Sequence, residues 1–368
     1  MRAWLIGMAA VAAALAGGVA VASAQVFHWG DGLEAPAEVP GTASAKHIDA
    51  GNASGYALTG SGTVLAWGRG AFGALGDGSV KNSSTALGVH LPVGVQAVSL
   101  GEAERSGFAV TSTGHVFAWG MDKHGDLCLG PEQEEATVSR PQEIPGLTGA
   151  VAVQGAKNHV LILLSNGTVD TCGWGPEGQL GLGKGVKEVT RPRPVPGLER
   201  IVQVSAGPTV SDARTASGEV FVFGSNREGQ AGLGAEVKRV YEPTRLPLPG
   251  AASSISVGGA DPMAHTMALV EGVPYCWGND EEGECGDGSE ESKLTPAVAT
   301  ALTGLGPLAA VVATGATTMA LTEGGDLYSV GFEQELGVPG GGSPFMAQFV
   351  EGGVVEISGT AQNHLDRH

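Results

Sequence analysis

The segment Gly178–Lys184 has the glycine and lysine spacing of a phosphate-binding loop, G-x-x-x-x-G-K. Such a loop needs a Ser or Thr after the lysine to bind magnesium, and a helix must follow it so that its N-terminal amides meet the phosphate. Here Gly185 stands at the hydroxyl position, and Pro192 and Pro194 lie where the helix would run. We therefore predict a structural turn and no nucleotide site.

Histidines and acidic residues are the other side chains that could do chemistry. His159, His265 and His364 each follow a short apolar segment that ends in glycine, and three histidines could bind a metal or act in catalysis. Because they recur in one sequence context, we predict instead that they hydrogen bond to backbone groups at a sheet edge. The acidic stretches 132–136 and 279–292 lack the spacing of a calcium loop. We predict no metal site, no cofactor and no catalytic residue.

The four cysteines contain no C-x-x-C pair, so nothing indicates a zinc knuckle or a thioredoxin-type site. Cys276 and Cys285 are nine residues apart, across a predicted strand and its turn. This spacing permits a disulfide in an oxidising compartment, and buried free thiols are the alternative. Cys128 and Cys172 are left without an assigned partner.

The stretch at Trp174 is one of seven copies of a short pattern, which begin at Trp29, Trp67, Trp119, Trp174, Phe223, Trp277 and Val330. The mean spacing of the copies is about 50 residues, the size of a propeller blade. Because the tryptophans recur in register, we predict that Trp29, Trp67, Trp119, Trp174 and Trp277 pack between layers of the core.

Each copy is preceded by a short apolar segment that ends in glycine, at Gly51, Gly101, Gly155, Gly207, Gly259, Gly315 and Gly359. Between the two patterns, two apolar runs flank a turn that contains glycine, as in residues 159–174, and this arrangement predicts a β-hairpin. The runs are apolar at nearly every position. Both faces of each strand must therefore be covered, as in sheets stacked face to face.

The two ends of the chain favour a closed ring over an open solenoid. Residues 26–30 contain only the trailing half of a repeat, and residues 354–364 contain only the leading half. Since the two halves complete one repeat, we predict a seven-bladed β-propeller in which the N- and C-terminal strands share one blade.

The frame of glycine, hairpin, W-G and G-Q-x-G resembles the regulator of chromosome condensation repeat. The best copies are residues 169–183 and 220–234, and the poorest ends at residues 327–337, where Val330 replaces the tryptophan. The resemblance covers essentially all of residues 25–368. It implies the same seven-bladed propeller and does not fix a function.

Residues 1–24 have the features of a signal peptide. They contain one Arg, an apolar run and the small-residue motif Ala22-Ser23-Ala24, so we predict cleavage before Gln25 and a propeller over residues 25–368. We expect a secreted or periplasmic protein. The alternative is an uncleaved membrane anchor, because residues 3–24 are long enough to span a bilayer.

The formal net charge of −18 argues against nucleic-acid partners and against anionic membranes once the signal peptide is removed. We predict a monomeric, non-catalytic module that binds another protein through loops on one face of a rigid ring. The loops after the segment-ending glycines include Arg105, Lys157 and Met263, which we predict contact the partner. We place Arg69, Phe72 and Arg227 on the opposite face.

Three other functions remain open. The resembling family includes exported propellers that inhibit β-lactamases, but those place aromatic residues in loops that are nearly free of them here. A propeller enzyme that uses carboxylates at the channel mouth is the second alternative. Nucleotide exchange on the GTPase Ran, the family's best-known role, conflicts with the signal peptide and the acidic charge.

Overall fold

The computed structural model describes residues 3–5, 25–30, 33–50, 54–131, 136–259, 263–333, 336–338 and 343–358. Their regular structure is almost entirely β. The short turns η1 (Ala71–Gly73) and η3 (Thr300–Leu302) are 3₁₀ helices.

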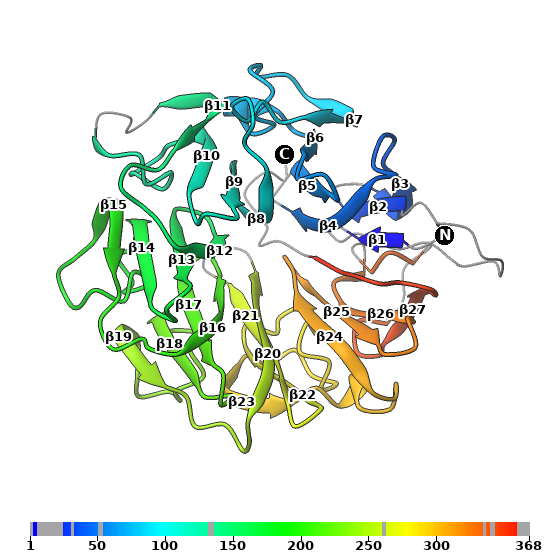
Figure 1. Cartoon of the computed structure of the whole chain (residues 1–368). Helices are drawn as coiled ribbons and strands as arrows, with labels where there is room; N and C mark the ends of the chain where they lie inside the picture. Colours follow the sequence, from blue (N-terminus) through cyan, green and yellow to red (C-terminus); the bar gives the residue numbers. More distant parts are fainter. Residues whose placement is uncertain are drawn as a thin grey trace.

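Six four-stranded antiparallel sheets form the blades of a β-propeller around a central axis (Figure 1). Blade 1 contains β4 (Ala45–Ala50), β5 (Ser54–Thr59), β6 (Val64–Gly68) and β7 (Ser83–Gly88); blade 2 contains β8 (Ala97–Ala103), β9 (Ser106–Thr111), β10 (Val116–Met121) and β11 (Thr137–Glu143). Blade 3 contains β12 (Ala150–Gly155), β13 (His159–Leu164), β14 (Val169–Trp174) and β15 (Glu188–Pro194); blade 4 contains β16 (Ile201–Ala206), β17 (Val210–Thr215), β18 (Val220–Ser225) and β19 (Arg239–Arg245). Blade 5 contains β20 (Ala252–Gly259), β21 (Ala264–Val270), β22 (Val273–Gly278) and β23 (Lys293–Val298); blade 6 contains β24 (Leu308–Ala313), β25 (Thr317–Thr322), β26 (Leu327–Gly331) and β27 (Gln348–Glu351).

The prediction of seven blades is wrong, because the structure has six. In place of a shared blade, β2 (Gln25–Gly30) pairs antiparallel with β3 (Leu33–Glu38) and parallel with β1 (Ala3–Leu5). The prediction assumed that residues 1–24 were removed, which would leave an edge of β2 unpaired. In the whole chain residues 3–5 already pair with that edge, and residues 355–358 form no strand.

The C-terminal segment still packs against the first blade. The Val354 amide donates a 2.8 Å hydrogen bond to the Gly325 carbonyl, and Ile357 lies against the apolar cluster that includes Trp67. Ser358 Oγ donates a 3.1 Å hydrogen bond to Asp49 Oδ1. His364 lies outside the described residues.

The core lies between neighbouring blades. The second and third strands are buried on both faces, as their continuous apolar runs predict; β13, for example, is buried over its first five residues. Between blades 1 and 2, Trp119 Nε1 and the Tyr56 hydroxyl both donate hydrogen bonds to the Ala74 carbonyl, at 2.9 and 2.7 Å. The two rings meet edge to face at 5.9 Å.

The last or the last-but-one residue of every third strand is a glycine with φ between 95° and 123°; these glycines are Gly68, Gly120, Gly173, Gly224, Gly278 and Gly331. Five of these six cross the chain just before the second strand or at its first residue so closely that a Cβ would lie 2.3 to 2.5 Å from a carbonyl oxygen. Both the positive φ and the close approach require glycine here.

The stretch Gly178–Lys184, which resembles a phosphate-binding loop, packs closely against the next blade. Gly178 has φ 104°, and a Cβ there would lie 2.5 Å from the Val240 carbonyl oxygen in the outer strand of the next blade. The residues that follow form strand β15 rather than a helix. The predicted structural turn is confirmed.

Replacing Gly224 with Ala should destabilise the propeller by at least about 3 kcal/mol, because a Cβ would lie 2.4 Å from the Thr209 carbonyl oxygen. Gly197→Ala is the matched control, since Gly197 also has positive φ but has no atom within 4 Å of its Cβ position. The control should cost only about 1 kcal/mol for the left-handed backbone. Chemical denaturation of both variants measures the difference, and equal losses would show that the close contact does not matter.

Candidate functional site

The loops that join the first strand to the second and the third strand to the fourth emerge at the same end of the propeller, because strand direction alternates within each blade. This end, which we call the loop face, includes the described residues 69–82, 104–105, 122–131, 136, 156–158, 175–187, 207–209, 226–238, 263, 279–292, 314–316, 332–333, 336–338 and 343–347. It is the candidate functional site, because loops on a rigid scaffold can vary without changing the core.

Arg105 and Phe72 lie together on the loop face. The Arg105 guanidinium carbon is 5.5 Å from the centroid of the Phe72 ring, although the two residues belong to loops of different blades. The assignment of Arg69, Phe72 and Arg227 to the opposite face is therefore wrong. The first and third strands of a blade run in the same direction, so their ends lie on one face.

The three predicted partner-binding residues lie on this face in separate blades. Arg105 is exposed, and its guanidinium lies 3.1 Å from Glu104 Oε1. Lys157 follows β12 in blade 3, and Met263 precedes β21 in blade 5, both half-buried. Whether they contact a partner remains a prediction.

Carboxylates gather near the axis, where the innermost strands of blades 1 and 2 meet the C-terminal segment. Burial raises the pKa of Asp49 to about 6 and that of Glu356 to about 8, and it raises the pKa of Glu102 well above its ordinary value. Repulsion from Asp49 adds to the shifts of both glutamates, whereas hydrogen bonds from the Ala50 amide and from Ser358 lower the pKa of Asp49. With a pKa of about 8, Glu356 is therefore mainly protonated at neutral pH. Among the described residues, no group of three or more His, Cys, Asp or Glu side chains is arranged to bind a metal.

The predicted structural histidines connect neighbouring blades. His159 Nε2 lies 2.7 Å from Ser211 Oγ, which itself donates to the Gln179 carbonyl, so the imidazole is the donor. His265 Nε2 lies 3.1 Å from Thr318 Oγ1. Burial lowers the pKa of His159 to about 3 and that of His265 to about 4, so both rings are neutral. Both rings thus contact a hydroxyl of the next blade, and His265 also has a hydrogen bond with the Thr317 backbone, as the sequence suggested.

Three of the repeated tryptophans share one structural position, while a fourth does not. Trp67, Trp119 and Trp277 each stand directly before the positive-φ glycine of their strand, and all three are buried. In blade 3 that position belongs to Cys172, because the segment reads C-G-W-G and its first glycine has the positive φ. Trp174 is half-buried and stacks on His124 with ring centroids 5.0 Å apart. The Trp29 side chain lies outside the described part of the chain.

A disulfide that the sequence did not indicate joins blades 2 and 3 through Cys128 and Cys172, whose Cα atoms are 5.7 Å apart. Elsewhere a glycine with positive φ approaches the third strand of the next blade; a Cβ at Gly76 would lie 2.9 Å from Trp119. Cys128 takes the place of this glycine, with φ 60°, and Cys172 takes the place of the tryptophan. An alignment of the repeats by the glycine near the end of each third strand could have found the pair.

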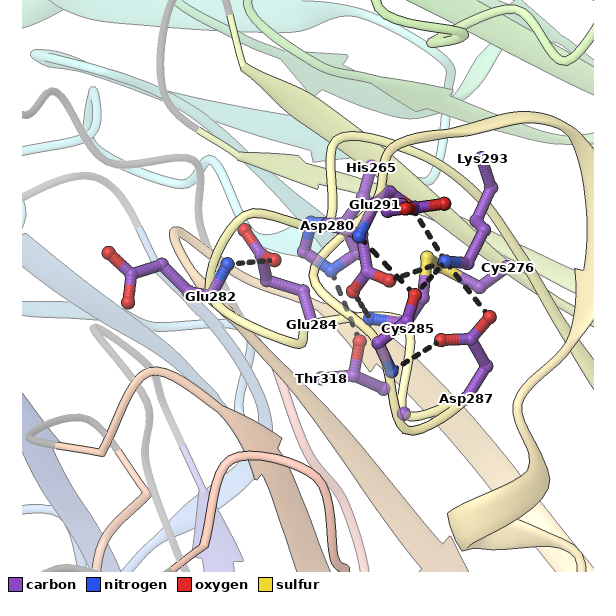
Figure 2. The surroundings of a disulfide bond; sticks show 12 residues. His265, Cys276, Asp280, Glu282, Glu284, Cys285, Asp287, Glu291, Lys293 and Thr318 are labelled. Atoms are coloured by element: carbon purple, nitrogen blue, oxygen red, sulfur yellow. Dashed lines mark hydrogen bonds and ion pairs between the residues drawn. A yellow bond between two sulfur atoms is a disulfide. The ribbon is translucent and has the colours of Figure 1, made fainter.

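The second disulfide, Cys276–Cys285, fastens the loop that follows β22 in blade 5 (Figure 2). Beside it, Lys293 Nζ lies 2.9 Å from both Asp280 Oδ2 and Asp287 Oδ2. Asp280 Oδ1 also accepts a 2.7 Å hydrogen bond from the Cys285 amide. The loop is thus held by a covalent bond and a mostly buried ion-pair triad.

A buried glutamate in this loop stands where other blades have glutamine. Glu284 Oε2 accepts a 2.9 Å hydrogen bond from the Glu282 amide, just as Gln230 Oε1 accepts one from the Glu228 amide at 3.0 Å. Burial raises the pKa of Glu284 to about 8 from its ordinary value of 4.5. The folded state therefore binds more protons than the unfolded chain between these values, and stability falls as pH rises through that window.

Replacing Glu284 with Gln should stabilise the protein by about 1–3 kcal/mol at pH 8 and have little effect near pH 5, because the amide keeps the hydrogen bond without a buried charge. Gln230→Glu is the reciprocal variant and should destabilise the protein most at pH 8. Thermal unfolding of each variant from pH 5 to pH 8 measures the effect. If the melting temperatures of the wild type and of Glu284→Gln differ by the same amount at pH 5 and at pH 8, the buried charge of Glu284 is not the cause.

Comparison with known proteins identifies the repeat. The model of the Regulator of chromosome condensation (RCC1) repeat matches residues 113–163, 166–211 and 217–269. The Ultraviolet-B receptor UVR8 of Arabidopsis thaliana is 28% identical over 235 residues, which are 63% of this chain and 52% of the receptor. The E3 ubiquitin-protein ligase HERC2 of Homo sapiens is 29% identical over 74% of this chain but only 6% of the ligase. The chain thus spans about half of the first relative and a small part of the second.

Solved structures agree on the fold. Human WBSCR16 superposes with a TM-score of 0.78 at 20% identity, covering 90% of this chain and 87% of that one. Prp20p from Saccharomyces cerevisiae superposes with a TM-score of 0.77 at 24% identity, and the match covers 93% of this chain and 90% of that one. The Regulator of chromosome condensation of Drosophila melanogaster is 34% identical over 174 residues, 46% of this chain and 30% of its own. With glycine, hairpin and loop in the same register in successive blades, residues 113–269 carry repeats of the regulator of chromosome condensation (RCC1) family.

Proposed function

We propose that this protein is a secreted, non-catalytic propeller that binds another protein through its loop face. The observation that supports this most is the contact of Arg105 with Phe72, which is 38% exposed and stands in a loop of the neighbouring blade. Arginine and aromatic side chains are enriched at protein interfaces. Among related propellers, yeast RCC1 (Prp20) has been crystallised bound to Kap60, which is consistent with a protein partner here.

The proposal of export rests on the N-terminal sequence and on the cysteines. All four cysteines are in disulfides, and such bonds persist mainly in oxidising compartments. Removal of residues 1–24 would leave residues 25–368 as the mature protein. No helix in the described part of the chain is long and apolar enough to cross a membrane.

A propeller enzyme is the second candidate, and one observation favours it. Asp49, Glu102 and Glu356 form a buried group of carboxylates whose raised pKa values suit proton transfer. Burial of protonated carboxyls also occurs at structural sites, and Asp212 shows the same rise in pKa at a position where other blades have an apolar residue. We therefore favour binding.

Partner capture should depend on the loop face. We expect the triple change Arg105→Ser, Lys157→Ser and Met263→Ser, and separately the double change Arg105→Ser and Phe72→Ser, each to reduce capture of partners from extracellular extracts at least tenfold. Quantitative mass spectrometry of the captured proteins measures the loss.

The control changes Lys46, Val93 and Arg200 to Ser near the opposite end of the propeller, and it should capture as much as the wild type. The melting temperature of every variant should lie within a few degrees of that of the wild type. If only the control variant loses its partners, the binding face is the opposite one. If no variant loses its partners, the loop face is not the site.

Export predicts the chemical state of the mature protein. Protein recovered outside the cytosol should begin at Gln25, and its four cysteines should resist alkylation until a reductant is added. Intact-mass measurement before and after reduction tests both. An extracytoplasmic chain that retains residues 1–24 would support the membrane-anchor alternative instead.

A further inference from the structure

Blade 6 exposes apolar side chains where its outer strand begins. Phe345 is 36% exposed, Met346 64% and Phe349 54%. Phe349 lies edge to face against Tyr328 on the neighbouring strand, with ring centroids 5.6 Å apart, so its ring is held in place. The outer strands of blades 2 and 3 begin with the exposed polar residues Thr137 and Glu188. The apolar surface is therefore not a feature of every blade.

Acidic side chains border this apolar surface. Residues 279–293, the loop fastened by Cys276–Cys285, contain seven acidic residues and one basic residue. The basic residue, Lys293, is paired with Asp280 and Asp287, so it does not neutralise the exposed carboxylates. A Cβ at Gly283 would lie 3.4 Å from Phe345 Cδ1, which places the loop directly against the apolar residues. In Figure 2 the Glu282 side chain points away from the disulfide.

Acidic residues are also concentrated in the C-terminal third of the whole chain. Residues 137–250 contain 12 basic and 10 acidic residues, whereas residues 251–368 contain 2 basic and 16 acidic residues. Blades 5 and 6 therefore produce a negative potential that attracts a cationic partner and repels an acidic one.

We propose that Phe345, Met346, Phe349, Glu281 and Glu282, which we call the blade-6 patch, bind a basic segment of another protein whose lysines or arginines flank apolar side chains. The apolar residues supply area to bury, and the carboxylates supply attraction and selectivity for positive charge. The inference rests on the proposed protein-binding function, but it uses loop-face residues of blades 5 and 6 that are different from Arg105, Lys157 and Met263.

The test is fluorescence anisotropy of the whole chain with labelled synthetic peptides. A peptide of alternating Lys and Phe should bind. A Lys-Ser peptide, which lacks apolar side chains, and a Glu-Phe peptide, which lacks positive charge, should each bind at least tenfold more weakly. Affinity for the Lys-Phe peptide should fall as salt increases, because the carboxylates are exposed.

Two pairs of variants locate the site. Met346→Ser with Phe349→Ser, and separately Glu281→Lys with Glu282→Lys, should each weaken binding of the Lys-Phe peptide at least tenfold. The matched controls are Val98→Ser with Val202→Ser, two valines 52% and 46% exposed on inner strands, and Glu236→Lys with Glu242→Lys on blade 4. Each control should change the affinity less than twofold.

Several results would overturn the inference. Equal binding of the Lys-Ser peptide would show that the interaction is non-specific charge attraction, and equal loss in patch and control variants would show that the patch is not the site. If the protein self-associates, Phe349→Ser abolishes that association and no peptide binds, the patch binds a second copy of the chain. The triple variant at Arg105, Lys157 and Met263 should bind the peptide normally, so failure of the blade-6 patch and failure of the site proposed at those three residues are separable.

Discussion

Every blade depends on one steric fact, which is that the last or the last-but-one residue of its third strand has no side chain. At Gly173 and Gly278 a Cβ would lie 2.3 Å from a carbonyl oxygen just before the second strand or at its first residue. The absence of that atom lets the third strand end over the preceding loop, and the positive φ turns the chain out toward the next blade. The glycine thus determines both the shape of a blade and the direction of its largest loop.

The outgoing loop then makes the contact that joins neighbouring blades, and the chain makes this contact in different ways. Gly76, Gly181 and Gly232 lie against Trp119, Phe223 and Trp277 of the next blade. Between blades 2 and 3 the same contact is the Cys128–Cys172 disulfide. A covalent bond can replace a glycine–aromatic contact because both bring the loop and the next third strand to the same separation. The contact between neighbouring blades is therefore kept although the residues that make it differ.

The charge state of the ionisable side chains differs between the interior of the propeller and its surface. Inside, burial raises the pKa of carboxyls such as Glu102 and Asp212, and it keeps His159 and His265 neutral, so the interior is less charged than the sequence suggests. Outside, charged side chains stay in water and act on partners. The loop of blade 5 contains both kinds: Glu284 is buried beside the disulfide, while Glu281 faces solvent.

The sequence by itself determined the features that are local and repeated. Glycine spacing and apolar hairpins predicted the all-β propeller and the repeat family, since each signal lies within about 50 residues and recurs. The structure also pairs Cys276 with Cys285, which are only nine residues apart. Tertiary structure alone decided what depends on distant partners. Residues 3–5 pair with β2 and replace the predicted shared blade, because an unpaired strand edge binds whichever strand reaches it. Cys128 meets Cys172 across 44 residues, and Phe72 meets Arg105 from another blade, because the stacking of blades brings together loops that no local pattern connects.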